Sequence, residues 1–146
     1  GRTHSCKRYK KIINSMSNLR LVQISLLVRE YDEAIHYYTN VLGFQLIEDT
    51  MLSATKRWVV VSPGITQASL LLAKAATPEQ EKAIGNQTGG RVFLFLYTDN
   101  FESTYQQYID KGVSFTEVPR TEKFGKVCVF KDLYGNLWDL IEPFNQ

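Results

Sequence analysis

The segment "KDLYGNLWDLIEP", residues 131–143, joins a tight turn directly to a strand of large apolar residues. The turn is Tyr134-Gly135-Asn136, which is typical turn chemistry. The strand that follows is built from Leu137, Trp138, Leu140 and Ile141. Asp139 lies in the middle of this strand, and a carboxylate among apolar neighbours is costly to bury unless it is paired. Asp139 is therefore the first candidate for a functional residue.

The second half of the chain, which ends with this segment, predicts one strand, one helix and three strands. The strand is "RVFLFLYT", residues 91–98, and the helix is "DNFESTYQQYIDKG", residues 99–112. Asp99 is expected to open this helix, Gly112 to close it, and its inward side chains are Phe101, Tyr105, Tyr108 and Ile109. Three strands are predicted around "VSFTEV", "KVCVF" and "LWDLIE".

The first half of the chain predicts the same order of elements. A strand over residues 19–28 is followed by a helix over 30–44 that ends at Gly43, and then by "FQLIEDTML", "RWVVVSP" and "ASLLLAK". The two closing glycines are about 69 residues apart, a period long enough for a complete supersecondary unit in each copy. The sequence therefore predicts an internal repeat.

An α+β fold follows from this repeat, with two tandem βαβββ modules whose curved mixed sheets pair around a cleft. We expect one domain over residues 19–143, with modules over 19–74 and 91–143. The connector, residues 75–90, is predicted to hold a short helix capped by Thr77 with Pro78 at its first position. A ligand would bind in the cleft.

Composition is that of an ordinary globular domain, with 146 residues, 44% of them hydrophobic and 22% charged. No apolar run approaches the roughly 20 residues that span a bilayer, and no secretory signal is visible. These observations predict a cytoplasmic protein without a membrane segment. Cys6 and Cys128 do not form a disulfide framework and are expected to be free thiols.

Positive charge is concentrated at the N-terminus. The net charge is +2, but the first twenty residues hold six of the 17 basic residues and no acid, so the remainder is acidic. Residues 1–18 are predicted to form a flexible basic arm. A basic arm can bind nucleic acid, but the acidic main domain argues against a nucleic-acid partner.

The doubled unit, with "YYTNVLGF" at residues 37–44 and "DLYGNLWDLIEP" at 132–143, resembles the vicinal-oxygen-chelate superfamily. This superfamily includes glyoxalase I, bleomycin-resistance proteins and extradiol dioxygenases. The resemblance runs from about residue 19 to 143 and implies four ligand positions for a divalent metal. Gln23 and Asp139 match two of them, whereas Leu71 and Phe93 occupy the other two and carry no donor atom.

The histidines lead to the same expectation about metal. His4 lies in the basic arm and His36 in the first helix, so no predicted strand offers an imidazole to the cleft. Zinc, nickel and iron sites generally need nitrogen or sulfur ligands. We therefore expect no metal and no other cofactor; if a divalent metal does bind, its ligands are Gln23 and Asp139.

Aromatic side chains are the strongest remaining sign of a binding site. Phe93, Phe95 and Tyr97 alternate on one strand and should share the face that looks into the cleft, and either Arg57 or Trp58 should point inward from another strand. Arg91 and Arg120 could pair with an anionic substituent. The polar segment before Val127 is either a lid over the cleft or a plain connection.

Three functions are compatible with these features. The first is a binding protein whose cleft holds a small aromatic or hydrophobic molecule, with Gln23, Trp58, Phe93, Phe95 and Tyr97 as ligand-binding residues. The second is a glyoxalase-like lyase or isomerase with Asp139 as catalytic base, with or without a divalent metal. The third, nucleic-acid binding by the arm, is the least favoured. The resemblance also implies a homodimer.

Overall fold

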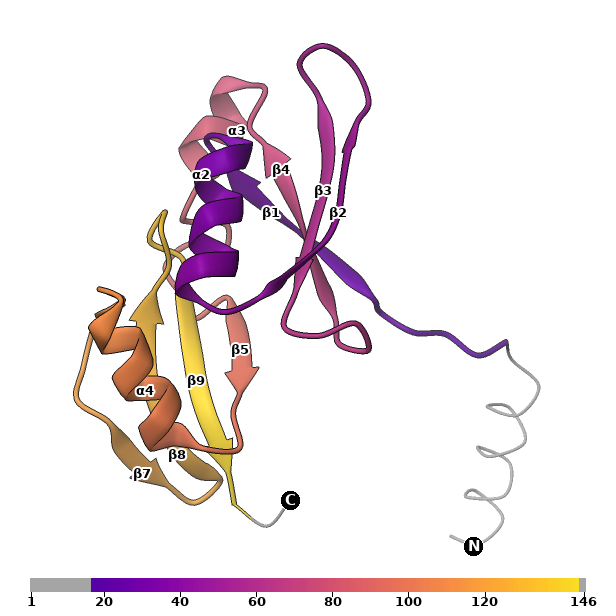
Figure 1. Cartoon of the computed structure of the whole chain (residues 1–146). Coiled ribbons are helices and arrows are strands. Elements are labelled where there is room, and N and C mark those ends of the chain that lie inside the picture. Colours follow the sequence, from indigo (N-terminus) through magenta and orange to yellow (C-terminus); the bar gives the residue numbers. More distant parts are fainter. Residues whose placement is uncertain (1–16, 145–146) are drawn as a thin grey trace, which may run out of the picture.

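The computed structural model describes residues 17–144, which form two sheets that each carry a helix on one face (Figure 1). The bounds in the first sheet are β1 (Gln23–Val28), β2 (Gln45–Met51), β3 (Arg57–Ser62) and β4 (Ser69–Lys74), in the spatial order β1-β4-β3-β2. In the second they are β5 (Leu94–Tyr97), β6 (Ser114–Phe115), β7 (Arg120–Glu122), β8 (Gly125–Lys131) and β9 (Leu137–Pro143), in the order β5-β9-β8-β6 with β7 paired to β8.

Both sheets are mixed in the same way, which confirms the predicted repeat and the α+β fold. β1 runs parallel to β4, and β5 runs parallel to β9, while the other pairings are antiparallel. A parallel pair needs a long crossover. In each unit that crossover contains a helix and leaves the first strand at the edge of its sheet.

The helices lie close to their predicted places. α2 (Tyr31–His36) continues into η1 (Tyr37–Val41), a π-helical turn that was not predicted, and Gly43 follows with φ +81°. α3 (Pro78–Ala83) lies in the connector, where Thr77 accepts a hydrogen bond from the Gln80 amide as expected of a cap. α4 (Phe101–Asp110) is capped by Asn100.

Some details differ from the sequence-based expectations. β1 begins at Gln23 instead of residue 19, and Asn100 instead of Asp99 caps α4 because its side chain accepts from the Ser103 amide. Ile109 is exposed. The polar segment proposed as a lid or plain connection forms the β7–β8 hairpin. Most of the basic arm, together with Cys6 and His4, lies outside the described residues.

One hydrophobic core runs through both units on the helix-covered faces of the sheets. It contains Leu26 and Leu72 from the first unit and Phe101 and Leu140 from the second. Aromatic rings connect the two halves: Tyr38, Phe44, Trp138 and Phe130 contact one another, with the Phe130 and Trp138 rings stacked and their centroids 5.8 Å apart. The two units are thus joined through their helix-covered faces.

The buried carboxylate of Asp132 ties the units together by hydrogen bonds. Its Oδ2 accepts from the Tyr38 hydroxyl at 2.5 Å, across the junction, and from the Trp138 indole at 3.2 Å. Both of its oxygens accept from the Asn136 side chain, and Oδ1 accepts from the backbone amides of Tyr134 and Asn136. Burial and the adjacent Asp132 raise the pKa of Tyr38, so Tyr38 stays a donor.

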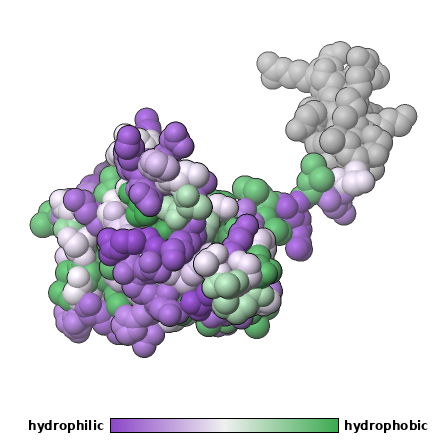
Figure 2. Space-filling model, turned by 90° about the horizontal axis from the view of Figure 1, so that it is seen from above, coloured by the Kyte–Doolittle hydropathy of each residue, from purple (hydrophilic) through white to green (hydrophobic). Residues whose placement is uncertain are grey.

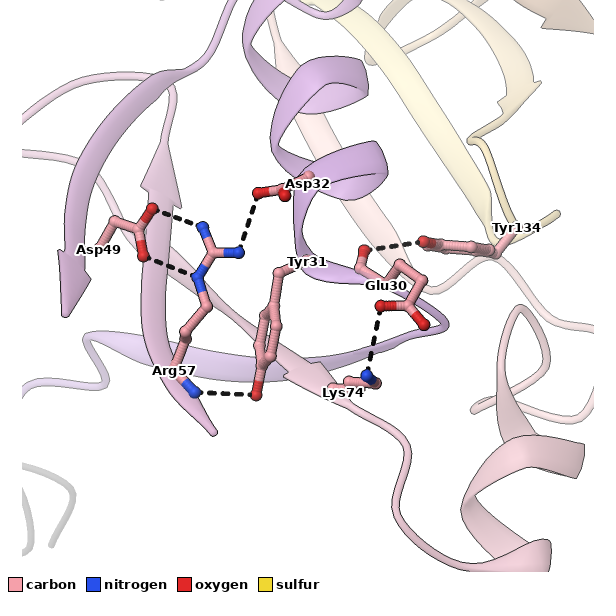
Figure 3. Close-up of polar contacts among 7 residues, drawn as sticks. All are labelled: Glu30, Tyr31, Asp32, Asp49, Arg57, Lys74 and Tyr134. Carbon is pink, nitrogen blue, oxygen red and sulfur yellow. Dashed lines mark hydrogen bonds and ion pairs between the residues drawn. The ribbon is translucent and has the colours of Figure 1, made fainter. Parts of the chain in front are cut away.

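Ion pairs fix α2 to the first sheet (Figure 3). Arg57 reaches Asp49 on β2 at 2.7 Å and Asp32 on α2 at 2.8 Å, and its guanidinium lies over the Tyr31 ring. Hydrogen bonds from Arg57 lower the pKa of Asp49. Arg57 therefore points toward α2. Successive residues of a strand face opposite sides, so Trp58 points to the other side of the sheet and is the inward residue of the two predicted.

Asp132→Asn should lower the free energy of unfolding by about 3 kcal/mol, because the amide would point an N–H group at a site where every partner is a donor. Urea denaturation followed by tryptophan fluorescence measures this change. Asp110→Asn, an exposed carboxylate on α4, is the control and should change the stability by less than about 0.5 kcal/mol. Equal stability of Asp132→Asn and the control would contradict the role given to Asp132.

Gly85→Ala should destabilise the protein more than Gly89→Ala. Both glycines have positive φ, +75° and +69°, so alanine costs backbone strain at either position. A Cβ on Gly85 would lie 1.9 Å from the Tyr134 carbonyl oxygen, whereas one on Gly89 meets nothing within 4 Å. The difference between the melting temperatures of the two variants reports on the packing of the connector against the turn at residues 132–136. Equal melting temperatures would argue against that packing.

Candidate functional site

Two adjoining hollows lie at the seam between the sheets and on the uncovered face of the first sheet, and the one at the seam reaches residues of the main core such as Phe44, Leu70 and Trp138. The larger, about 1100 Å³, lies between the first strands of the two units. The smaller, about 610 Å³, lies on the face of the first sheet that no helix covers. Gln67, Ala68 and Ser69 line both hollows and form their shared rim.

Phe95 and Tyr97 line the larger hollow, which we call the seam hollow. Their side chains are 62% and 61% exposed, unusual for large aromatic residues. They lie on the face of β5 away from the core because Leu94 and Leu96 take the alternate positions and pack on it. Ile24 and Leu70 from the first sheet also line this hollow.

Gln23 and Trp58 line the smaller hollow, which we call the sheet hollow. The Gln23 side-chain oxygen accepts from the Ser69 hydroxyl at 3.1 Å, at the rim shared with the seam hollow. Trp58 is half-buried beside Val60 and Ser62. The structure thus places four of the predicted ligand-binding residues on adjoining hollows, two on each.

Phe93 is placed differently from the prediction. It precedes β5, donates its backbone amide to the Leu137 carbonyl and packs against the core cluster. It does not line the larger hollow beside Phe95 and Tyr97. The alternation that pointed Phe93 into the cleft holds only inside a regular strand, and β5 begins at Leu94.

Asp139 lies on the same face of the second sheet as Phe95. The two residues are partners in the β5–β9 register, and Val129 is the partner of Asp139 on the other side. Its Oδ1 is buried and, among residues 17–144, has no hydrogen-bond partner. Burial raises the pKa of the Asp139 carboxyl; Arg120 acts in the opposite direction, and Glu117 raises the pKa further.

Arg120 does not offer a free positive charge. Its guanidinium binds Glu117 at 2.9 Å and Glu122 at 2.6 Å, so its expected pairing with an anionic ligand group finds no support. Cys128 is fully buried, its thiol donates to the Glu117 carbonyl, and burial raises its pKa to about 11. Burial and a raised pKa both make a thiol a poor nucleophile, which supports the predicted inert role. His36 is exposed on α2.

The residues at the four implied metal positions do not fit a divalent metal. Leu71 lies on the same face as Gln23 and has no donor atom, Phe93 packs on the core, and Gln23 is bonded to Ser69. Within residues 17–144 no group of three or more histidine, cysteine, aspartate or glutamate side chains could hold a metal ion. Gln23 and Asp139 line no common hollow.

Two residues of the site were not predicted from the sequence. Ser69 fixes the Gln23 amide, and Glu117 lies close enough to Asp139 to affect its pKa. Ser69 could have been found, because the four residues that follow it in its strand are all apolar. Glu117 could not, because it lies between β6 and β7 and reaches the site only through the pairing of both strands with β8.

Comparison with known proteins assigns the family. The model of the Glyoxalase/Bleomycin resistance protein/Dioxygenase superfamily matches residues 20–140. The chain belongs to this superfamily. An uncharacterized protein of Shewanella frigidimarina is 55% identical to this superfamily member over 124 residues, which is 84% of this chain and 92% of the relative.

Two solved structures are also similar to this chain. TnmS3, an antibiotic binding protein from Streptomyces sp. CB03234, has a TM-score of 0.73 and 25% identity, covering 88% of this chain and 98% of its own. A superfamily member from Sphaerobacter thermophilus has a TM-score of 0.74 and 25% identity, covering 87% and 99%. The sheets and their order are therefore those of the superfamily fold.

The helices between residues 17 and 144 are too short or too polar to cross a membrane. This agrees with the absence of a long apolar run in the sequence. The cytoplasmic location stays a prediction.

Asp139→Asn should stabilise the protein at neutral pH. A carboxyl whose pKa is higher in the folded than in the unfolded state binds protons more tightly when folded, so stability falls as pH rises between the two pKa values. The advantage of Asp139→Asn should therefore be full above the raised pKa and vanish below the ordinary value of 3.8. Chemical denaturation at several pH values measures this difference, and a pH-independent difference would show that Asp139 is not perturbed.

Proposed function

We propose that this superfamily member binds a small aromatic or hydrophobic molecule in the seam hollow, without a tightly bound catalytic metal. The observation that carries the proposal is the exposure of Phe95 and Tyr97, 62% and 61%, on the wall of a hollow of about 1100 Å³. Exposed aromatic rings on a concave surface offer stacking and apolar contact to a planar ligand.

The residues around these rings support an apolar ligand. Ile24, Phe44, Leu70 and Trp138 contribute apolar wall to the seam hollow, and Gln67, Ser69, Thr98, Asp99 and Glu142 are its polar lining residues. The likeness to the antibiotic binding protein from Streptomyces adds a further reason to expect a small molecule. Gln23 and Trp58, on the adjoining sheet hollow, would contact a ligand that extends past Ser69.

We also propose that two chains pair as a homodimer. β1 and β5 are edge strands, and the β1 edge is partly covered by Gln87, whose amide bonds the Leu27 N–H and the Ser25 carbonyl. Hydrophobic side chains gather on the surface where the chain leaves toward its N-terminus (Figure 2). Leu21, Val22, Ile47 and Ile65 are all exposed beside the sheet hollow. Exposed apolar area of this kind favours a protein interface.

A lyase or isomerase with Asp139 as base is the second candidate. The raised pKa of this carboxyl and its unpartnered oxygen favour a general base. Gln23, the polar group expected to assist it, lies on the sheet hollow and bonds to Ser69. Gln23 is therefore not placed to assist Asp139 in catalysis, and we favour binding without turnover over the lyase or isomerase.

A neutral planar probe tests the proposed function. Hydroxymethyl-anthracene should bind the full chain, and Phe95→Ala should weaken its binding by about fivefold because a stacking partner is lost. Fluorescence titration of the probe gives both affinities. Phe124→Ala is the matched control, because Phe124 is also an exposed phenylalanine, 52%, but does not line the seam hollow.

Two results would count against this proposal. If the probe did not bind, or if Phe95→Ala and Phe124→Ala weakened binding equally, the seam hollow would not be the site. Elemental analysis of protein prepared without chelators should find well under one metal ion per chain. About one equivalent of nickel, zinc, iron or manganese would instead support a metal enzyme with Gln23 and Asp139 as ligands.

A further inference from the structure

Asp139 is the one acidic side chain that β9 places among apolar neighbours on the face it shares with Phe95. Leu137 and Ile141 flank it along β9, and Phe95 and Val129 flank it across the sheet. Neighbouring strands are about 4.8 Å apart, so the carboxylate and the base of the Phe95 side chain are adjacent. A polar group in this position needs a partner to offset its lost hydration.

The described residues do not supply that partner. Oδ1 of Asp139 is buried without a hydrogen bond, in contrast to Asp132, whose oxygens accept six. The terminal torsion of an aspartate is broad, so a rotation about it can present either oxygen to an incoming group. Asp139 is thus an acceptor without a donor, next to an exposed aromatic ring.

The charges around Asp139 favour a cationic donor. The nearby guanidinium, Arg120, is already bound by Glu117 and Glu122. Glu117 itself adds negative charge, enough to raise the pKa of Asp139, and the adjacent Cys128 thiol is uncharged. A neutral donor would satisfy the hydrogen bond only, whereas a cation would also offset the excess of carboxylates.

We infer that the ligand of this site carries a protonated amine beside its aromatic ring, and that the Asp139 carboxylate receives the amine. The inference rests on the proposed function, because it assumes that the ring lies against Phe95 in the seam hollow. Asp139 is the strand neighbour of Phe95 and does not itself line that hollow, so the amine would extend past Phe95 toward it. The ammonium would lie between the carboxylate and the exposed aromatic ring. An aromatic face attracts a cation as well, so Phe95 and Asp139 act on the same group.

Three anthracene probes of equal ring size test the inference, with a methylammonium, a hydroxymethyl or a carboxylate substituent. The wild-type chain should bind the methylammonium probe about tenfold more tightly than the hydroxymethyl probe, as expected for a charge-assisted hydrogen bond. It should bind the carboxylate probe most weakly. Fluorescence titration of the full chain measures all three affinities.

Asp139→Asn should remove the preference for the methylammonium probe, so that this probe binds no more tightly than the hydroxymethyl probe. Asp110→Asn removes one negative charge from the exposed end of α4 and should keep the wild-type preference. The comparison of the three probes on the wild type needs no variant, so equal binding of the methylammonium and hydroxymethyl probes would overturn the inference even if Asp139→Asn does not fold.

The outcomes separate the two proposals. Equal binding of the methylammonium and hydroxymethyl probes to the wild type would overturn the amine but leave the aromatic site standing. A preference that persists in Asp139→Asn would also overturn it, because the attraction would then come from elsewhere. Binding of none of the probes would overturn both the amine and the proposed function.

Discussion

The structure depends on the buried carboxylate of Asp132, because this group connects the two units where hydrophobic packing alone would leave their relative position free. Tyr38 comes from the first unit, and Asn136 and Trp138 from the second, and all three donate to the same two oxygens. Directional hydrogen bonds to a buried charge are expensive to leave unmade. The aromatic rings around them then pack in one arrangement.

Joining the units through their helix-covered faces leaves the other faces of the sheets open. The first sheet shows Gln23 and Trp58 on its open face, and the second shows Phe95 and Asp139. Successive residues of a strand point to opposite faces, so a residue packed in the core is followed by one that is free to contact a ligand. The comparison of Asp132 with Asp139 makes this concrete, since one carboxylate is saturated with donors and the other has an oxygen with none.

Local patterns predicted the elements well because their signals come from nearby residues. The closing glycines at 43 and 112, the Thr77 cap and the inward positions of Tyr38 and Tyr108 all occur as expected. The predictions were wrong at two kinds of position: where two neighbouring residues could both cap a helix, and where a strand ends. Asn100 caps α4 in place of Asp99. Phe93 does not share the face of Phe95 and Tyr97, because β5 begins only at Leu94.

The sequence by itself determined the repeated strand–helix–strand order, the family, and which aromatic and acidic residues deserved attention, because periodicity and turn chemistry are local properties. Only the tertiary structure decided how these residues are grouped. It placed Gln23 and Asp139 apart, tied Arg120 to Glu117 and Glu122, and left Asp139 next to Phe95. Such groupings depend on strand register and on contacts between distant segments, which no local pattern encodes.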